Sequence, residues 1–188
     1  MNQTDKIFST INFFENPLEK GEYEQCTFLG CNFSDTDLSD IHFSECSFSH
    51  CNLSNVRIFG TAFRDVRFLE CKMLGLRFDT CNEFGLQMRF ENCTLNYASF
   101  YGLHLKKTVF SNCSMQETDL TECDLTQAVF DRCDLNRAAF GNTVLVKADF
   151  RTALHFSINP ATNRVKKARF SASNLSGLLD PFDINIEP

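Results

Sequence analysis

The chain contains none of the short motifs that mark the common enzyme classes. Its 188 residues include no glycine-rich phosphate loop, no Walker sequence and no Gly-x-Ser-x-Gly nucleophile turn. The four histidines, at positions 42, 50, 104 and 155, belong to none of these motifs. We therefore predict no catalytic residues, no cofactor and no enzymatic activity.

Signals for export or membrane insertion are also absent. No apolar run is long enough to span a bilayer, and Met1–Lys6 lacks the basic start and apolar stretch of a signal peptide. The length suits one domain, 1–188. We expect a cytoplasmic protein without membrane contact.

What the sequence does have is a phenylalanine about every twenty residues, a fixed period typical of repeat architectures. Within each twenty, a large apolar residue recurs every five positions, with a small residue two positions before it, as in Ala128-Val129-Phe130. A period of five matches neither a helix nor a simple strand. The series predicted to form one core column is Phe28, Phe48, Phe68, Phe90, Phe110, Phe130, Phe150 and Phe170.

A chain that turns a corner every five residues closes a square coil in twenty. Stacked coils then place residues twenty apart directly above one another at ordinary strand spacing, about 4.8 Å. Four apolar columns point inward, whereas the positions after each centre are mostly polar. This pattern predicts an all-β stack of rings, with His155 as a structural imidazole in one of the core columns.

All ten cysteines obey the same pattern, each two positions before a repeat centre. There is no Cys-x-x-Cys, and a linear column cannot bring four thiolates around one zinc ion. We predict buried, reduced thiols that act as small apolar side chains, with no bound metal. So many free thiols favour a reducing compartment.

Breaks in the repeat divide the domain into an N-terminal coil (1–22), regular coils (23–150), an irregular coil (151–169) and a C-terminal segment (170–188). Twelve residues rather than ten separate Phe78 from Phe90, which predicts a two-residue bulge near 82–87. The bulge is either a functional loop or a neutral insertion. Pro160 cannot donate a ladder hydrogen bond, so 157–164 is expected to turn or leave the coil.

The C-terminal segment is predicted to close the rod and to join two copies. Ser176–Phe182 fits a short helical cap, and the polar–apolar alternation of Asp183–Glu187 fits a terminal strand. The apolar residues exceed what one end of a narrow rod needs. We therefore predict an end-to-end homodimer through Leu178, Leu179, Phe182, Ile184 and Ile186.

Over roughly residues 8–175 the units resemble the Ala-(Asp/Asn)-Leu-x-x consensus of the pentapeptide-repeat family. The resemblance implies a right-handed quadrilateral parallel β-helix. The order of Asn159-Pro160, the basic repeat Lys166–Phe170, the Leu-Leu cap and the terminal strand is similar to the quinolone-resistance (Qnr) proteins. The stretch Leu103–Phe110 resembles the microcin immunity (McbG) proteins.

These resemblances imply binding to a type II topoisomerase, DNA gyrase or topoisomerase IV, by imitation of duplex DNA. Such binding protects the enzyme from a quinolone or a toxin. The chain lacks the larger loop insertions of Qnr proteins, which puts drug protection in doubt more than topoisomerase contact.

Acidic charge is concentrated at the start of the chain. Residues 1–56 hold nine acidic and two basic side chains, a net charge of −7, whereas residues 101–188 sum to zero. An acidic half can steer towards a basic groove, and the sequence indicates no basic stripe for direct binding of nucleic acid. The alternative is a generic scaffold for another protein, whose acids keep the rod soluble. The candidate contact residues are Asp35, Asp37, Asp40, Glu45, Glu83 and Phe84.

Overall fold

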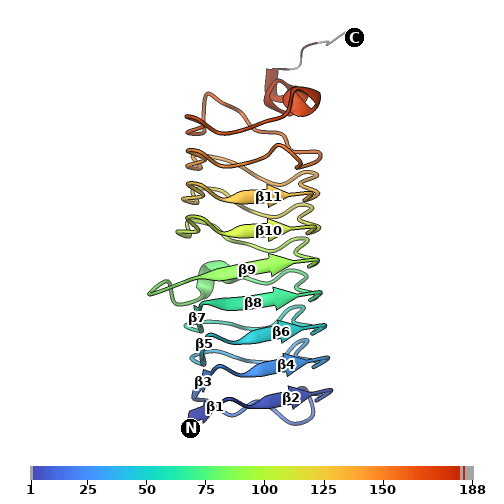
Figure 1. The fold of residues 1–188 in the computed structure, drawn as a ribbon, viewed down its shortest axis with the longest axis vertical. Coiled ribbons are helices and arrows are strands. Elements are labelled where there is room, and N and C mark those ends of the chain that lie inside the picture. Colours follow the sequence, from blue (N-terminus) through green and yellow to red (C-terminus); the bar gives the residue numbers. More distant parts are fainter. Residues whose placement is uncertain (1, 183, 185–188) are drawn as a thin grey trace.

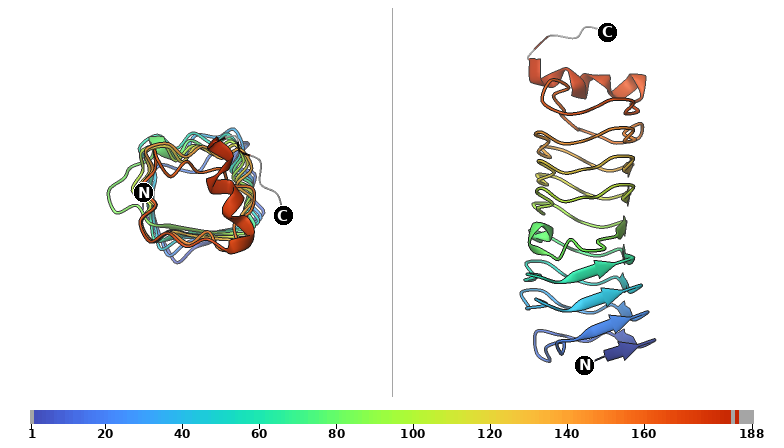
Figure 2. Two further views of the ribbon diagram at one scale, coloured as in Figure 1. Left: turned by 90° about the horizontal axis from the view of Figure 1, so that it is seen from above. Right: turned by 90° about the vertical axis from the view of Figure 1, so that its left-hand side faces the viewer.

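The chain winds into a rod of stacked coils in the computed structural model, which describes residues 2–182 and residue 184 (Figure 1). Seen along the rod, the coils superimpose on a square outline (Figure 2). The five-residue period predicted the square coil, and the protein is the right-handed quadrilateral parallel β-helix that the family resemblance implied. Among the described residues, no helix has the length and apolar character needed to cross a bilayer.

Two sides of the square are parallel sheets, and every described pairing joins one coil to the next. Face 4 carries β1 (Asn2–Thr4), β3 (Glu22–Glu24), β5 (His42–Ser44) and β7 (Ala62–Arg64). Face 1 carries β2 (Ile7–Ser9), β4 (Thr27–Leu29), β6 (Ser47–Ser49), β8 (Val66–Leu69), β9 (Met88–Glu91), β10 (Val109–Ser111) and β11 (Val129–Asp131).

Faces 2 and 3 are held by single parallel bridges rather than by full strands. Face 2 follows face 1 along the chain and includes the bridge Asn32–Asn52, and face 3 includes the bridge Asp37–Arg57. The short 3₁₀ helix η1 (Phe78–Thr80) interrupts face 3. The four faces thus keep an in-register ladder along most of the rod, so most surface positions have neighbours one coil above and below them.

The predicted phenylalanine column fills the core. Successive rings from Phe8 to Phe170 are stacked with centroids 4.6 to 5.4 Å apart. Phe28 to Phe150 of this column are buried, whereas Phe170 is half-buried because the last coil has a neighbour on one side only. Offset stacking of this kind contributes beyond the area that it buries.

A residue in the left-handed backbone region makes most of the corners. Asp35, Asp40 and Glu45 have φ of 58°, 59° and 54°. Similar positive φ values recur at five-residue steps along most of the rod. Asn, Asp and Gly adopt this conformation most readily, but His, Lys, Arg and Glu occupy it here as well. The backbone bonds between coils hold these corners in place.

All ten cysteines are buried and free, as predicted. Eight of them, all except Cys81 and Cys113, do more than fill space, because the thiol donates a hydrogen bond to a backbone carbonyl of the previous coil. Cys51 Sγ lies 3.3 Å from Phe28 O, and Cys123 Sγ lies 2.9 Å from Phe100 O. Thr61 fills the same slot with a hydroxyl, 2.8 Å from Leu38 O.

The predicted bulge precedes β9. Strand β8 pairs with β9 at an offset of two extra residues, Val66 with Met88 and Phe68 with Phe90. The segment with the two extra residues projects from the square outline as a loop, which is green in Figure 2. The core column continues through it without a break, since Phe68 and Phe90 still stack at 5.3 Å.

The prediction for His155 was wrong. The imidazole lies on the surface with its Nδ1 atom 2.8 Å from Asp134 Oδ1, and Phe156, 3% exposed, takes the place in the core. Burying a phenyl ring gains more than burying an imidazole that already has a carboxylate partner at the surface. Pro160 lies in the expected turn, residues 160–162.

The helical cap is present but begins earlier than predicted, as η2 (Ala172–Leu178) followed by η3 (Asp180–Phe182). Asn174 Nδ2 donates to Phe150 O at 2.9 Å and to Ala153 O at 3.2 Å, which satisfies carbonyls at the open end of the stack. Gly177 packs so closely on Phe156 that a Cβ atom would overlap it. The predicted terminal strand, with Ile186, lies outside the described residues apart from Ile184.

Replacing Phe110 with alanine should destabilise the rod by about 3–5 kcal/mol, because it removes a fully buried ring from a continuous stack. The matched control is Phe59→Ala, whose ring is 65% exposed and should cost less than about 0.5 kcal/mol. Urea unfolding followed by circular dichroism measures both. Equal effects of the two substitutions would contradict the stacked core.

The thiols should be unreactive in the folded protein. Burial raises the pKa of Cys46, Cys81 and Cys123 to about 12, so these side chains stay protonated at neutral pH. A thiol reagent at neutral pH should label no cysteine of the native protein and all ten after denaturation. Rapid native labelling would show that the column is open to solvent.

Candidate functional site

Three of the predicted acidic contact residues come together on the rod. Asp35 and Asp40 occupy the two corners that border face 3, and Asp37 lies on that face between them. All three side chains are exposed. Glu45 is separated from them by face 4 and lies at the next corner, where Gln25 Nε2 donates to it at 3.1 Å. The four carboxylates therefore do not form one cluster: three lie around face 3, and Glu45 lies at the far edge of face 4.

The charge of Asp37 is the most constrained of the four. Hydrogen bonding by Ser39, whose backbone N–H is 2.8 Å from Asp37 Oδ1, lowers the pKa of this carboxyl. Lys20 and Arg57 each lie 3.6 Å from it, so part of its field is neutralised. Asp35, Asp40 and Glu45 form no ion pair within the described residues and project the larger share of negative charge.

The loop at 82–87 holds an aromatic side chain in solvent. Phe84 is 79% exposed, and Arg64 covers one side of it with the guanidinium carbon 5.7 Å from the ring centroid. Asn82 Oδ1 accepts the N–H of Phe84 at 2.9 Å, and Glu83 lies 3.4 Å from His104 Nδ1. These contacts hold the loop in place and leave the Phe84 ring in solvent.

A basic edge between faces 4 and 1 was missed by the sequence analysis. The left-handed corner residue of this edge is acidic or amide in the first coils, namely Asp5, Gln25, Glu45 and Asp65, and then becomes Lys107, Gln127, Lys147 and Lys167. The change of sign is hidden in a charge count along the chain. It appears when residues are read in steps of twenty with the two-residue insertion included.

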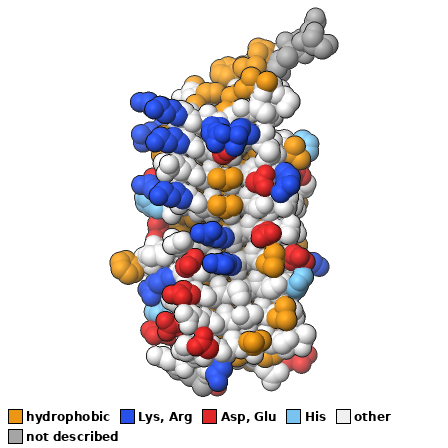
Figure 3. All heavy atoms as spheres, viewed as in Figure 1, with side chains coloured by type: hydrophobic (Ala, Val, Ile, Leu, Met, Phe, Trp, Pro, Cys, Tyr) orange, Lys and Arg blue, Asp and Glu red, His pale blue; other side chains and the backbone are white. Residues whose placement is uncertain are grey.

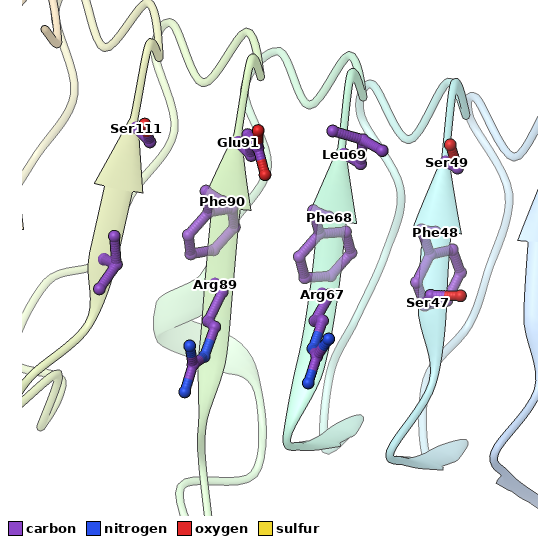
Figure 4. Close-up of a pocket in the computed structure, with 11 residues that line it drawn as sticks. Ser47, Phe48, Ser49, Arg67, Phe68, Leu69, Arg89, Phe90, Glu91 and Ser111 are labelled. Carbon is purple, nitrogen blue, oxygen red and sulfur yellow. The ribbon is translucent and has the colours of Figure 1, made fainter. Parts of the chain in front are cut away.

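A shallow groove of about 500 Å³ crosses face 1 over β6, β8, β9 and β10. Its floor is formed by the strands that carry Phe48, Phe68 and Phe90, whose rings are buried in the core, and Arg67 and Arg89 stand side by side within the groove (Figure 4). Basic side chains are followed by hydrophobic ones up the middle of this face (Figure 3). The sequence analysis did not single out either arginine, although their separation equals that of Phe68 and Phe90.

The C-terminal cap exposes apolar side chains. Leu178 packs on the core, whereas Leu179, Phe182 and Ile184 are 37%, 52% and 54% exposed. Leu175 adds a further exposed side chain from η2. Three of the predicted dimerisation residues, Leu179, Phe182 and Ile184, are therefore exposed together at the end of the rod.

Each histidine lies beside a carboxylate of an adjacent coil, and none is near another histidine in the repeat frame. The pairs are His42 with Glu22, His50 with Glu70, His104 with Glu83 and His155 with Asp134. In the part of the chain that the structure describes, no three His, Cys, Asp or Glu side chains are placed to hold a metal ion.

A family profile described as "Pentapeptide repeat region" matches residues 22–85 and 86–178. No curated protein matches the chain. HetL, a pentapeptide repeat protein involved in heterocyst differentiation regulation in the cyanobacterium Nostoc sp. strain PCC 7120, is similar in structure, with a TM-score of 0.64 and 17% identity over 90% of this chain and 84% of that one.

Two further solved structures are similar over much of their length. A trypsin-treated variant of QnrB1, a plasmid-mediated fluoroquinolone resistance protein, has a TM-score of 0.49 and 17% identity over 100% of both chains. Rfr23 from the cyanobacterium Cyanothece 51142 has a TM-score of 0.29 and 16% identity, covering 76% of this chain and 86% of that chain.

Proposed function

Because the chain belongs to the pentapeptide-repeat family, we propose that it is a non-catalytic, protein-binding solenoid that acts in the cytoplasm by imitating DNA. Its partner is a type II topoisomerase, gyrase or topoisomerase IV, which it protects from a toxin or a quinolone. The observation that carries the proposal is the concentration of exposed carboxylates on the first coils of a rigid rod.

The acidic coils suit a basic groove that normally holds DNA. Residues 1–56 carry a net charge of −7, and Asp35 and Asp40 are fixed at corners whose backbone cannot rearrange without breaking bonds between coils. A rod with preset charges loses little entropy on binding. Duplex DNA carries one charge per about 1.7 Å of axis, so the imitation is sparse. The similarity of the 159–182 region to Qnr proteins supports the choice of partner.

One observation favours a second candidate function. The basic edge at Lys107, Lys147 and Lys167 breaks the acidic surface, and the charges in Figure 3 lie in patches rather than in one stripe. Duplex DNA has no such change of sign. A generic scaffold that binds another protein, without a topoisomerase role, fits this patchy charge.

Neutralising the acidic coils should weaken gyrase binding without unfolding the rod. The variant Asp35→Asn, Asp37→Asn, Asp40→Asn, Glu45→Gln keeps the side-chain shapes, and Asn tolerates the left-handed corner. We expect at least about tenfold weaker binding, with a parallel loss when salt is raised, because exposed charges are screened. Binding to immobilised gyrase measures the affinity, and supercoiling with and without a quinolone measures the effect.

The matched control removes the same number of negative charges elsewhere, as Glu91→Gln, Glu117→Gln, Glu122→Gln and Asp180→Asn. It should bind gyrase like the wild type. If the wild type neither binds gyrase nor alters its supercoiling or quinolone sensitivity at micromolar concentration, the scaffold function replaces the proposal.

We also propose that two copies join end to end at their caps. The exposed side chains of Leu179, Phe182 and Ile184 would be covered by the same residues of the second copy, as in most homodimers. Replacing all three with glutamate should give a folded monomer by light scattering at tens of micromolar, because Leu178 and the core are untouched. Phe14→Glu with Phe59→Glu, both exposed far from the cap, should leave the dimer intact. A wild-type monomer under these conditions would contradict the proposal.

A further inference from the structure

Two arginines of face 1 are placed directly against each other. Arg67 on β8 and Arg89 on β9 are partners in the parallel ladder, so their backbones are separated by about one strand spacing, 4.8 Å. Both side chains are exposed and extend in the same direction (Figure 4). Like charges opposite each other on neighbouring strands are destabilising, so an anion bound between them would relieve repulsion.

No carboxylate in the described part of the chain forms an ion pair with either arginine. Most other arginines contact an acidic side chain, namely Arg57, Arg77, Arg132, Arg137, Arg151 and Arg169. Within the described residues, Arg67 and Arg89 form no ion pair. Asp65 and Glu91 are near them in sequence, yet neither is paired with them. The two guanidinium groups therefore remain available to a ligand.

The groove supplies further contacts in a fixed order along the rod. Ser47 is the ladder partner of Arg67 on one side, and Val109 is the partner of Arg89 on the other. Val129 follows Val109 in the same column. Lys107 lies at the corner two residues before Val109 and adds positive charge at the rim. A ligand lying along the column would meet a hydroxyl, two guanidinium groups and then an aliphatic surface.

We propose that this groove binds a phosphorylated segment of a partner protein. A phosphate monoester carries nearly two negative charges at neutral pH and three acceptor oxygens, so one group can bridge Arg67 and Arg89. A carboxylate or a phosphodiester carries a single charge and neutralises one guanidinium. An aliphatic side chain following the phosphorylated residue would pack on Val109. The proposal does not depend on which protein the acidic coils bind.

The test uses the full-length protein and the neutral-ended peptide acetyl-Ala-phosphoSer-Leu-Ala-amide in calorimetric titrations. Arg67→Gln and Arg89→Gln should each weaken binding about tenfold, the usual scale for loss of a charged hydrogen-bond partner. Arg137→Gln, which alters an exposed arginine paired with Glu117 at 3.7 Å, is the control and should bind like the wild type. Circular dichroism checks that each variant folds.

Titrations at lower pH and with other ligands test whether the groove selects a doubly charged phosphate. Lowering the pH from about 7.5 to about 5 should weaken binding, because the phosphate loses one charge near pH 6. The same peptide with glutamate in place of phosphoserine should bind at least about tenfold more weakly. Absence of binding at millimolar peptide, an equal loss in the Arg137 variant, or no preference over the glutamate peptide would each overturn the proposal. Tighter, Arg67-dependent binding of a single-stranded oligonucleotide would assign the groove to nucleic acid instead.

Discussion

The in-register ladder between coils is the constraint on which the rest of the structure depends. Each coil donates and accepts backbone hydrogen bonds with the next, as in Phe33 N to Asn52 O at 2.7 Å and Asn52 N to Cys31 O at 3.0 Å. The ladder brings like residues of successive coils into contact, which stacks the phenyl rings and aligns the thiols. It has the same effect on the surface, where Arg67 is brought against Arg89. The same strand register therefore aligns the side chains of the core and those of the surface.

The ladder also explains why the corners tolerate residues that rarely adopt the left-handed backbone conformation. A non-glycine residue in the left-handed region costs of order 1–3 kcal/mol, and His50, Lys107 and Arg132 all adopt it. The backbone N–H groups of His50 and Lys107 donate to carbonyls of the next coil, Lys107 N to Thr126 O at 2.9 Å for example, and that of Arg132 donates to Thr152 Oγ1 at 3.0 Å. The corner side chains are therefore free to vary in charge, and they carry much of the surface chemistry.

The periodic part of the fold could be predicted from the sequence because one side chain type, phenylalanine, marks the register in nearly every coil. The insertion before β9 and the buried cysteines followed from the same frame. The exchange of His155 for Phe156 could not be foreseen, since it depends on Asp134 lying one coil away. The basic edge and the arginine pair were missed for another reason: charge was counted along the chain, whereas the fold groups residues by column.

Reading charge by column changes what the rod can imitate. Asp5, Glu45 and Asp65 give one edge a negative sign in the first coils, and the lysines from Lys107 onward reverse it along the same edge. A DNA duplex has one sign throughout, so the imitation that we propose can extend only over the acidic coils. A partner that contacts the whole edge needs basic groups opposite one half and acidic groups opposite the other. Such a partner can hold the rod in a single direction, because turning it end for end would oppose like charges.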